Sequence, residues 1–316
     1  MAYISDFNEG IRLNNQAFLV KSKVMALTKA GKDYISTTLI DKTGSIDAKI
    51  WDVNNGGIME FDTGDFVSVS GQITNYNGNL QLKVERIRTL AAEEVNMADY
   101  IPSSRFDVED MYKEMLEMIE SIKEEHIKVL LKSFFVEDKE FIKSFKTISA
   151  AKTVHHGFAG GLLEHSLSVA RMCSHMADNY DFLNRDLLLA AAMLHDVGKV
   201  KELSEFPAND YTELGNFMGH IVLGYEMVKE HIDKIEDFPV CLGQELEHCI
   251  LSHHGELEFG SPKKPAIAEA IALSFADNMD AKMETIREVC EDNANNTNAW
   301  FGYNKWLDSN VRRTEI

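Results

Sequence analysis

Long apolar stretches are missing from this sequence. The longest, Leu187–Leu194, falls far short of the roughly 20 apolar residues that a membrane-spanning helix needs. The first residues, MAYISDFNEG, contain no basic region followed by an apolar one, so no signal peptide is predicted. The four cysteines form no CxxC pair, and we interpret them as free thiols in a reducing compartment. These absences predict a cytoplasmic protein that does not cross a membrane.

An excess of basic charge is missing as well. The formal net charge is −19, which argues against a general nucleic-acid-binding surface. Residues 1–100 carry 10 Lys and Arg against 13 Asp and Glu, whereas the remainder carries 22 against 38. Residues 12–51 are locally basic, with seven basic and three acidic side chains. An acidic protein with a mixed surface gives the same totals, so the distribution of charge is more informative than its sum.

A small β domain is predicted at the start of the chain. With 316 residues, of which 45% are hydrophobic, the chain can form about two domains with sizeable cores. From Gln16, apolar and polar residues alternate, and Lys42-Thr43-Gly44 and Asn77-Gly78 predict tight turns. Five strands are predicted, at residues 17–28, 33–41, 45–52, 64–74 and 80–90. Five strands in about 75 residues fit a small closed barrel.

The strand order resembles an OB fold over residues 16–90. The segments IDAKIWD and TGDFVSVSGQI resemble the nucleic-acid-binding OB modules of synthetases and exonucleases. Such modules stack bases on aromatic side chains along a basic groove. Trp51 lies on an alternating segment and is expected in the core. The residues expected to contact a nucleic-acid strand are Lys21, Lys23, Lys32, Tyr34, Lys49 and Tyr76. Core or turn packing for the aromatics, and an ordinary solvated face for the lysines, are the alternatives.

The rest of the chain has a helical pattern. Residues 91–106 contain charge, Pro102 and Ser103-Ser104 without a clear period, and we interpret them as a linker. Asp107 is expected to cap a long amphipathic helix, and almost every later apolar pattern has the helical period. The predicted organisation is therefore an OB domain at residues 1–90, a linker at 91–106 and an all-α domain at 107–316.

Five histidines and two aspartates lie at or near the ends of predicted helices. In chain order they are His165, His195, Asp196, His220, His253, His254 and Asp277. One histidine on an apolar helix is usually a packed core residue, but seven such residues are hard to explain independently. An aspartate after the buried segment Leu187–Leu194 is costly unless it is paired or binds a metal. Gly198 is expected to end that helix in the left-handed conformation, and Gly255 to end the helix before it. Imidazoles bind first-row transition metals and carboxylates can bridge two of them, so the pattern predicts a two-metal hydrolase site.

This pattern resembles a known superfamily. His165, His195-Asp196 and Asp277, with Gly198-Lys199 after the dipeptide, resemble the HD-domain phosphohydrolases, which are all-helical and use bound metal. The added His220 and His253-His254 resemble the subset with two metals. The order of the two domains, with the motifs GGLLEHSLSVA and MLHDVGKVKEL, resembles the YhaM-type 3′→5′ exoribonucleases over residues 10–290.

The resemblance implies roles for single residues. It implies that His165, His195, Asp196 and Asp277 hold a first metal, and that Asp196 bridges to a second metal completed by His220, His253 and His254. It also implies that a water activated between the metals attacks the terminal phosphodiester of single-stranded RNA and releases 5′-mononucleotides, with DNA as a further candidate substrate. Lys199 is expected to neutralise charge on the phosphate, the alternative being a surface lysine.

Other interpretations stay open at this stage. A cyclic-nucleotide or nucleotide phosphohydrolase is one alternative, although a mononucleotide needs no strand-binding barrel. A non-catalytic RNA-binding regulator is another, although the full ligand set argues against it. Histidine-rich ligation favours manganese or iron over magnesium. Asp280 is expected to orient a ligand, and the C-terminal aromatics, Trp300, Phe301 and Trp306, to pack onto the helices. The oligomeric state is left open, with a homo-oligomer among the alternatives.

Overall fold

The computed structural model describes residues 3–28, 31–76, 78–96, 99–101, 103–152, 156–206, 208–293 and 298–314. The chain divides into two compact units, at residues 1–103 and 104–316. This division falls inside the segment that the sequence predicts as a linker. Asn77 and Pro102, which entered the predictions above, lie outside the described residues.

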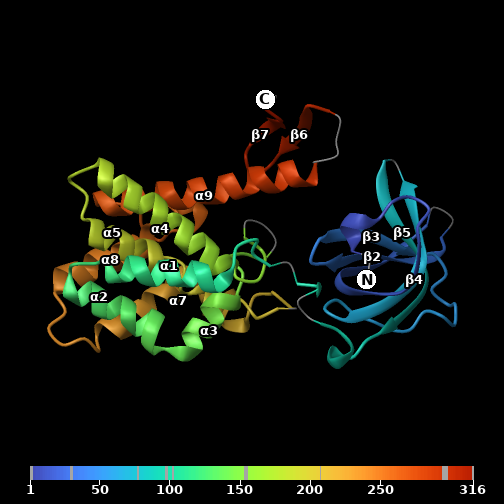
Figure 1. Ribbon diagram of the computed structural model, residues 1–316, viewed down its shortest axis with the longest axis horizontal. Helices are drawn as coiled ribbons and strands as arrows, with labels where there is room; N and C mark the ends of the chain where they lie inside the picture. The colour runs from blue at the N-terminus through green and yellow to red at the C-terminus, as the bar shows by residue number, and fades with distance from the viewer. Residues whose placement is uncertain are drawn as a thin grey trace. The chain divides into compact units, whose positions relative to one another are not determined.

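The first unit is a closed barrel of five strands (Figure 1). The strands are β1 (Arg12–Leu27), β2 (Asp33–Asp41), β3 (Gly44–Ile50), β4 (Phe66–Tyr76) and β5 (Asn79–Thr89). Their order around the barrel is β1-β2-β3-β5-β4, with β3 and β5 parallel and the other pairs antiparallel. Two short 3₁₀ helices, η1 (Ile4–Asp6) and η2 (Ala92–Glu94), accompany it. The predicted OB barrel is confirmed.

Alternation along the strands builds the barrel core. In β2, every second residue from Ile35 is buried, and the same alternation recurs in β3. The largest fully buried side chains of this unit include Phe18, Leu39, Ile50, Ile73 and Leu82. The prediction that Trp51 lies in the core is wrong. Trp51 directly follows the buried Ile50, so the same alternation turns it to the outer face, where it is 43% exposed and stacks on Tyr34.

The second unit is a bundle of α-helices. They are α1 (Val108–Glu120), α2 (Glu125–Lys132), α3 (Lys139–Thr147), α4 (Gly161–Asn179), α5 (Arg185–Leu194), α6 (Lys199–Glu202), α7 (Glu213–Ile232), α8 (Val240–Ser252) and α9 (Ala268–Asp292). A π-helical turn, η4 (Ser133–Glu137), and a 3₁₀ helix, η5 (Leu257–Phe259), complete the helical elements. Asp107 caps α1 as predicted, because its side chain accepts hydrogen bonds from the backbone N–H groups of Glu109 and Asp110.

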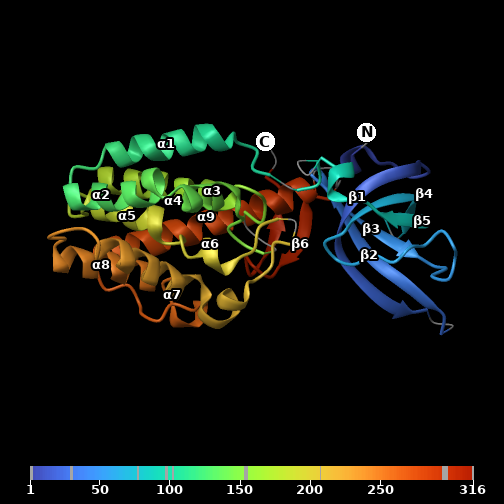
Figure 2. The ribbon, with the colours of Figure 1, turned by 90° about the horizontal axis from the view of Figure 1, so that it is seen from below.

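Helix α5 lies in the middle of this bundle. All of its residues from Leu187 to Leu194 are buried, as their uniformly apolar sequence predicts. It packs against α4, α8 and α9. Figure 2 shows α1 on one side of α4 and α5, and α7 and α8 on the other side. The carboxyl end of α5 therefore lies in the interior of the unit. None of the helices among the described residues is long and apolar enough to span a membrane, and all four cysteines are free thiols.

The end of the chain departs from the all-α expectation. Two short strands, β6 (Trp300–Asn304) and β7 (Ser309–Arg312), form an antiparallel hairpin after α9. The predicted packing of the C-terminal aromatics onto the helices is wrong for Trp300 and Trp306, which are 60% and 50% exposed. Val311 is the one buried residue of this hairpin among the residues described there.

Candidate metal centre

The turn after α5 places Asp196 between two groups of histidines. Asp196 is almost fully buried, and its two carboxylate oxygens face different neighbours. Its Oδ2 lies 3.5 Å from His165 Nε2 and 3.4 Å from His195 Nε2. Its Oδ1 lies 3.4 Å from His220 Nε2 and 3.7 Å from His253 Nε2. One carboxylate therefore serves two clusters, which is the arrangement that a bridging ligand requires.

The first cluster, defined here as His165, His195 and Asp277, joins three helices. His165 comes from the first turns of α4, His195 from the end of α5, and Asp277 from the middle of α9. One ligand atom of each lies within 4.8 Å of the others. The Nε2 atoms of His165 and His195 are 3.2 Å apart, and His165 Nε2 is 3.2 Å from Asp277 Oδ1.

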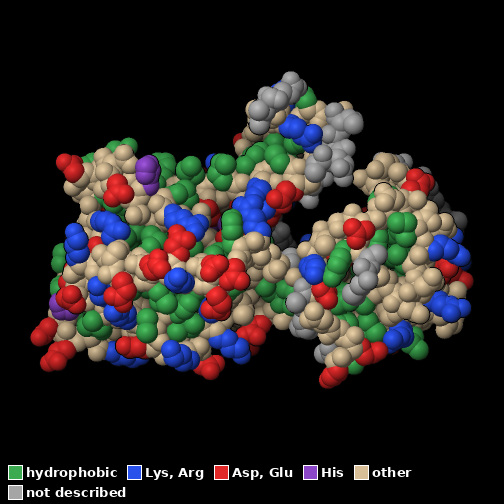
Figure 3. Space-filling view, viewed as in Figure 1, with side chains coloured by type: hydrophobic (Ala, Val, Ile, Leu, Met, Phe, Trp, Pro, Cys, Tyr) green, Lys and Arg blue, Asp and Glu red, His purple; other side chains and the backbone are tan. Residues whose placement is uncertain are grey.

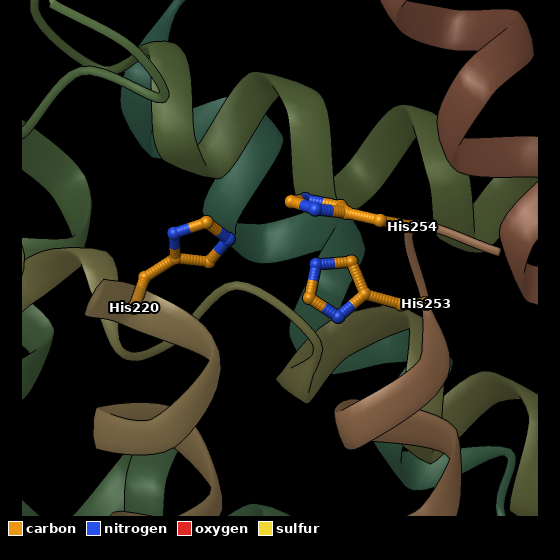
Figure 4. A group of neighbouring side chains, drawn as sticks. All are labelled: His220, His253 and His254. Atoms are coloured by element: carbon orange, nitrogen blue, oxygen red, sulfur yellow. The ribbon is translucent and has the colours of Figure 1, made fainter. Parts of the chain in front are cut away.

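The second cluster consists of imidazoles alone: His220, His253 and His254. His220 comes from α7, and His253 and His254 follow directly after α8. Figure 4 shows the three rings turned toward one another, and their ligand atoms lie within 4.8 Å of one another. The rings of His253 and His254 are nearly perpendicular, with centroids 4.3 Å apart.

All five imidazoles use Nδ1 for a hydrogen bond and turn Nε2 inward. Nδ1 of His195 donates to the carbonyl of Ala192, and Nδ1 of His253 to the carbonyl of Ile250. The remaining three Nδ1 atoms lie 2.7–3.0 Å from acceptors on Asp280 (for His165), Glu202 (for His220) and Phe259 (for His254). Because these oxygens can only accept, each Nδ1 carries a hydrogen, and Nε2 is the nitrogen left to bind a metal.

The metal-ligating atoms have few partners of their own. Within the part of the chain that the structure describes, Asp196 Oδ1, His220 Nε2 and His253 Nε2 are buried without a hydrogen-bond partner. Burying an unpaired polar atom costs about 1–3 kcal/mol, so three such atoms pointing at one space require compensation. A divalent cation supplies it, since imidazole nitrogens and carboxylate oxygens are the ligands that transition metals prefer. The residues present therefore fit a divalent metal.

Two acidic residues hold the histidines from behind. Asp280 lies one helical turn after Asp277 on α9 and accepts hydrogen bonds from His165, His156 and Ser168. Glu202, on α6, accepts both from the backbone N–H of His220 (2.9 Å) and from its ring (3.0 Å). The orienting role expected of Asp280 thus has a contact in the structure. Glu202 was not predicted, and its signal in the sequence is a lone acidic residue in the segment after His195-Asp196.

In the first cluster, the neighbouring carboxylates favour a protonated His165. Burial acts against protonation, but hydrogen bonds to Asp277 and Asp280 raise the pKa of His165 to about 10. Burial likewise opposes ionisation of the carboxyls, yet the hydrogen bond from His165 lowers the pKa of Asp277, and those from His156 and His165 lower the pKa of Asp280. Without a metal, this cluster is an ion pair of one imidazolium and its carboxylates.

In the second cluster, His253 and His254 favour the neutral form. Burial, with repulsion from His254 and His195, lowers the pKa of His253 well below its usual 6.5. Burial and the neighbouring His220 also lower the pKa of His254. These rings are therefore deprotonated at pH 7, which is the form that binds a metal.

Lys199 belongs to the same site. Its Nζ lies 2.7 Å from Asp196 Oδ2, and its side chain is 14% exposed. Burial lowers the pKa of Lys199, but the carboxylate of Asp196 outweighs burial and raises it, so the ammonium stays charged. Lys199 also lines a cavity of about 420 Å³ together with His165, His254 and Asp277. A charged lysine at the wall of this cavity can contact an anion.

Glycines set the approach of the helices. Gly198 has φ −62° and ψ −19°, so the expected left-handed conformation is wrong. A Cβ at Gly198 would lie 2.0 Å from the carbonyl oxygen of His220, which shows that the glycine is needed for the close approach of α7. Gly219, at φ 70°, breaks α7 immediately before His220. Gly255, at φ 81°, is left-handed after His254, as expected.

The predicted strand-contacting residues of the barrel do not form one group. Tyr34 stacks on Trp51 with ring centroids 4.9 Å apart, and Lys49 bonds Ser36 on the same pair of strands. Lys21 is exposed at a bulge of β1, whereas Lys23 bonds Asp62 and the carbonyl of Phe61. Tyr76 is 65% exposed at the far end of β4, opposite Asn79. Lys32 is exposed in the connection before β2.

Comparisons with known proteins agree with both units. Residues 162–282 match the model of the HD domain family, and residues 18–90 match that of an OB-fold nucleic acid binding domain. The chain is similar to the protein named 3′-5′ exoribonuclease YhaM of Listeria monocytogenes, with 36% identity over 275 residues, covering 86% of each chain. It is 35% identical to that of Bacillus subtilis over 280 residues, covering 88% of this chain and 87% of the relative. The corresponding protein of a Geobacillus species is 36% identical over 277 residues, covering 86% and 83%.

Proposed function

Because the chain belongs to the YhaM family of 3′-5′ exoribonucleases, we propose that it hydrolyses single-stranded RNA from the 3′ end at a centre of two divalent metal ions. It is a metal-dependent hydrolase of phosphodiester bonds with an RNA-binding OB module. The observation that carries the number of ions is the division of Asp196 between two clusters, each with enough ligands for one ion. The imidazole-rich ligand set favours manganese, with iron and magnesium as the alternatives.

The residues have separate tasks in this proposal. His165, His195 and Asp277 hold one ion, His220, His253 and His254 the other, and Asp196 both. When bound, a pair of divalent cations stabilises charge on the attacking and leaving oxygens and makes water acidic enough to react near neutral pH. Asp280 and Glu202 fix the rings that they contact, so that each Nε2 points to the metal without rearrangement.

Lys199 provides the remaining positive charge. In the structure its ammonium is held by Asp196 Oδ2, at the wall of the cavity that contains the metal ligands. We assign it to the scissile phosphate, where it offsets negative charge that develops on the non-bridging oxygens. Its position three residues after Asp196, on the first turn of α6, directs both side chains to the same space.

The barrel is assigned to the strand upstream of the cleaved end. Its candidates for this role are Lys21, Lys23, Tyr34, Lys49 and Tyr76. Of these, Tyr34 and Lys49 lie on neighbouring strands, β2 and β3, and Trp51 joins them through its stack on Tyr34. An aromatic pair beside a lysine is the combination that stacks a base and holds its phosphate.

Hydrolysis of a 5′-labelled single-stranded RNA in the presence of Mn²⁺ tests the function. The expected result is a ladder that shortens from the 3′ end with release of 5′-mononucleotides, and no cleavage of the same RNA with a blocked 3′ end. Since phosphate oxygens are common to RNA and DNA, the matched DNA strand is expected to be cleaved as well. Cleavage of a circular RNA, or hydrolysis of mononucleotides alone, would refute the proposal.

A further inference from the structure

Aromatic side chains stand at the mouth of the catalytic cavity. Phe259, at the end of η5, and Trp306, in the turn between β6 and β7, line the same cavity as His165, His254 and Asp277. Their side chains are 58% and 50% exposed, so they are not core residues. A large aromatic face that lies half open beside a polar floor is a surface for a ligand with an apolar face.

The hairpin that carries Trp306 combines aromatic rings with cations. Lys305 Nζ lies 4.6 Å from the centroid of the Trp306 ring, and Arg313 lies 5.2 Å from that of Phe301. Residues 298–314 contain three basic side chains and one acidic one, in a chain whose net charge is −19. Figure 3 shows basic side chains on this hairpin, whereas acidic and basic groups are mixed over the helices. Aromatic rings interleaved with cations are typical of surfaces that bind single-stranded nucleic acid.

The turn that presents Trp306 is held by hydrogen bonds. Asn304 Oδ1 accepts from the backbone N–H groups of Trp306 (2.9 Å) and Leu307 (3.1 Å). The hydroxyl of Tyr303 donates to Asp308 across the same turn at 2.6 Å. The backbone that carries Trp306 is thus fixed by its own turn, and half of the side chain is exposed beside the cavity.

We propose that Trp306 and Phe259 form a stacking site for the bases that flank the scissile phosphate at the 3′ end of the RNA. This proposal rests on the exonuclease function proposed for the metal centre. In that function the metal centre and Lys199 act only on phosphate, which is the same at every position of a strand. Stacking gives the end of the strand a sequence-tolerant hold, because every base has a π face. It also favours single strands, since the bases of a duplex are already stacked on each other.

Removal of the ring and removal of a base, alone and together, test the proposal. Three 5′-labelled RNAs are compared: one intact, one abasic at the last nucleotide and one abasic at the penultimate nucleotide. On the intact RNA, Trp306→Ala is expected to raise KM roughly tenfold with little change in kcat, and Trp306→Phe to restore most of the loss. On one of the abasic RNAs the effect of Trp306→Ala is expected to fall below about twofold, because the partner of the ring is already gone.

Trp300→Ala is the matched control, since Trp300 is 60% exposed on the same hairpin and does not line the cavity. The same loss on all three RNAs, or no loss on the intact RNA, would overturn the stacking site. A purely structural effect of Trp306→Ala would give such a uniform loss. The metal content of each variant is measured in parallel and is expected to equal that of the native chain.

The stacking site and the exonuclease function fail separately. Binding of the three RNAs in metal-free buffer, followed by fluorescence anisotropy, requires no cleavage. If the native chain binds but does not cleave, and Trp306→Ala weakens binding of the intact RNA alone, the function is wrong and the stacking site stands. If the native chain cleaves and Trp306→Ala changes KM by the same factor on every RNA, the stacking site is wrong and the function stands.

Discussion

The cluster of His165, His195 and Asp277 contains a carboxylate and has Asp280 behind it, whereas the cluster of His220, His253 and His254 contains imidazoles alone. The first cluster is therefore an internal ion pair when metal is absent, and the pKa of His165 is raised to about 10. In the second cluster, burial lowers the pKa of His253 well below its usual value, so that ring stays neutral. An imidazole can thus be ready for a metal in two ways. At His165 the metal displaces a bound proton, whereas His253 has already lost that proton before the metal binds.

The largest effect is expected where the two clusters meet. Asp196→Asn leaves the volume unchanged but removes the charge that both clusters share. We expect kcat/KM on RNA to fall on the order of 10³-fold, which corresponds to about 4 kcal/mol of transition-state stabilisation. Asp233→Asn, at an exposed carboxylate on the same unit, is the control and should leave kcat/KM unchanged. Near-native activity of Asp196→Asn would show that the clusters do not depend on a shared carboxylate.

Removal of one histidine from each cluster separates them. His165→Gln and His253→Gln are each expected to lose the ion of their own cluster and to keep the other, with a fall in activity on the order of 10²-fold. Elemental analysis after gel filtration measures the ions that remain. If either variant loses both ions, the two clusters are coupled more tightly than their separate ligand sets imply.

A smaller effect is expected from the residues behind the ligands. Asp280→Asn should weaken metal binding at the first cluster about 10- to 100-fold, and Glu202→Gln should do the same at the second. Each variant serves as the control for the other, because each carboxylate contacts a histidine of one cluster. Competition with a chelator gives the two affinities. Equal losses at both clusters in either variant would contradict the assignment.

The smallest expected effect is a difference between the two clusters in the pH dependence of metal binding. Below pH about 10, His165 carries a proton that a metal must displace, so affinity at the first cluster should rise about tenfold per pH unit up to that value. His253 and His254 have lowered pKa values, so their contribution to affinity at the second cluster should not change above pH about 6.5. Calorimetry in buffers of different ionisation enthalpy counts the released protons. Release of the same number of protons at both clusters would remove the contrast between them.

The sequence identified the candidate ligands but not the residues that surround them. His165, the pair His195-Asp196 and Asp277 stand at or near the ends of predicted helices, and the structure brings them together. Periodicity could not identify Glu202, because its hydrogen bond with His220 depends on the break in α7 at Gly219. Gly198 is needed because a Cβ at this position would collide with another helix. Local conformational preference does not reveal such a contact.

The barrel and the hairpin show the same limit. Alternation predicted the strands of the barrel, but the prediction for Trp51 was wrong because Trp51 follows the inward-facing Ile50 and therefore lies on the outer face. In the C-terminal segment apolar residues stand side by side, as in Trp300-Phe301 and Trp306-Leu307, so no alternation predicts strands. Its hairpin is fixed by side-chain hydrogen bonds of Asn304 and Tyr303. Contacts that depend on a turn of this kind are not encoded in periodicity.

The most direct test of the two-cluster centre is the number of manganese ions bound per chain, measured by equilibrium dialysis for the native chain and for Asp196→Asn. The account predicts two tightly bound ions in the native chain and weakened binding of both in the variant, because Asp196 gives one oxygen to each cluster. A single ion per native chain, or two ions held equally tightly by Asp196→Asn, would contradict it.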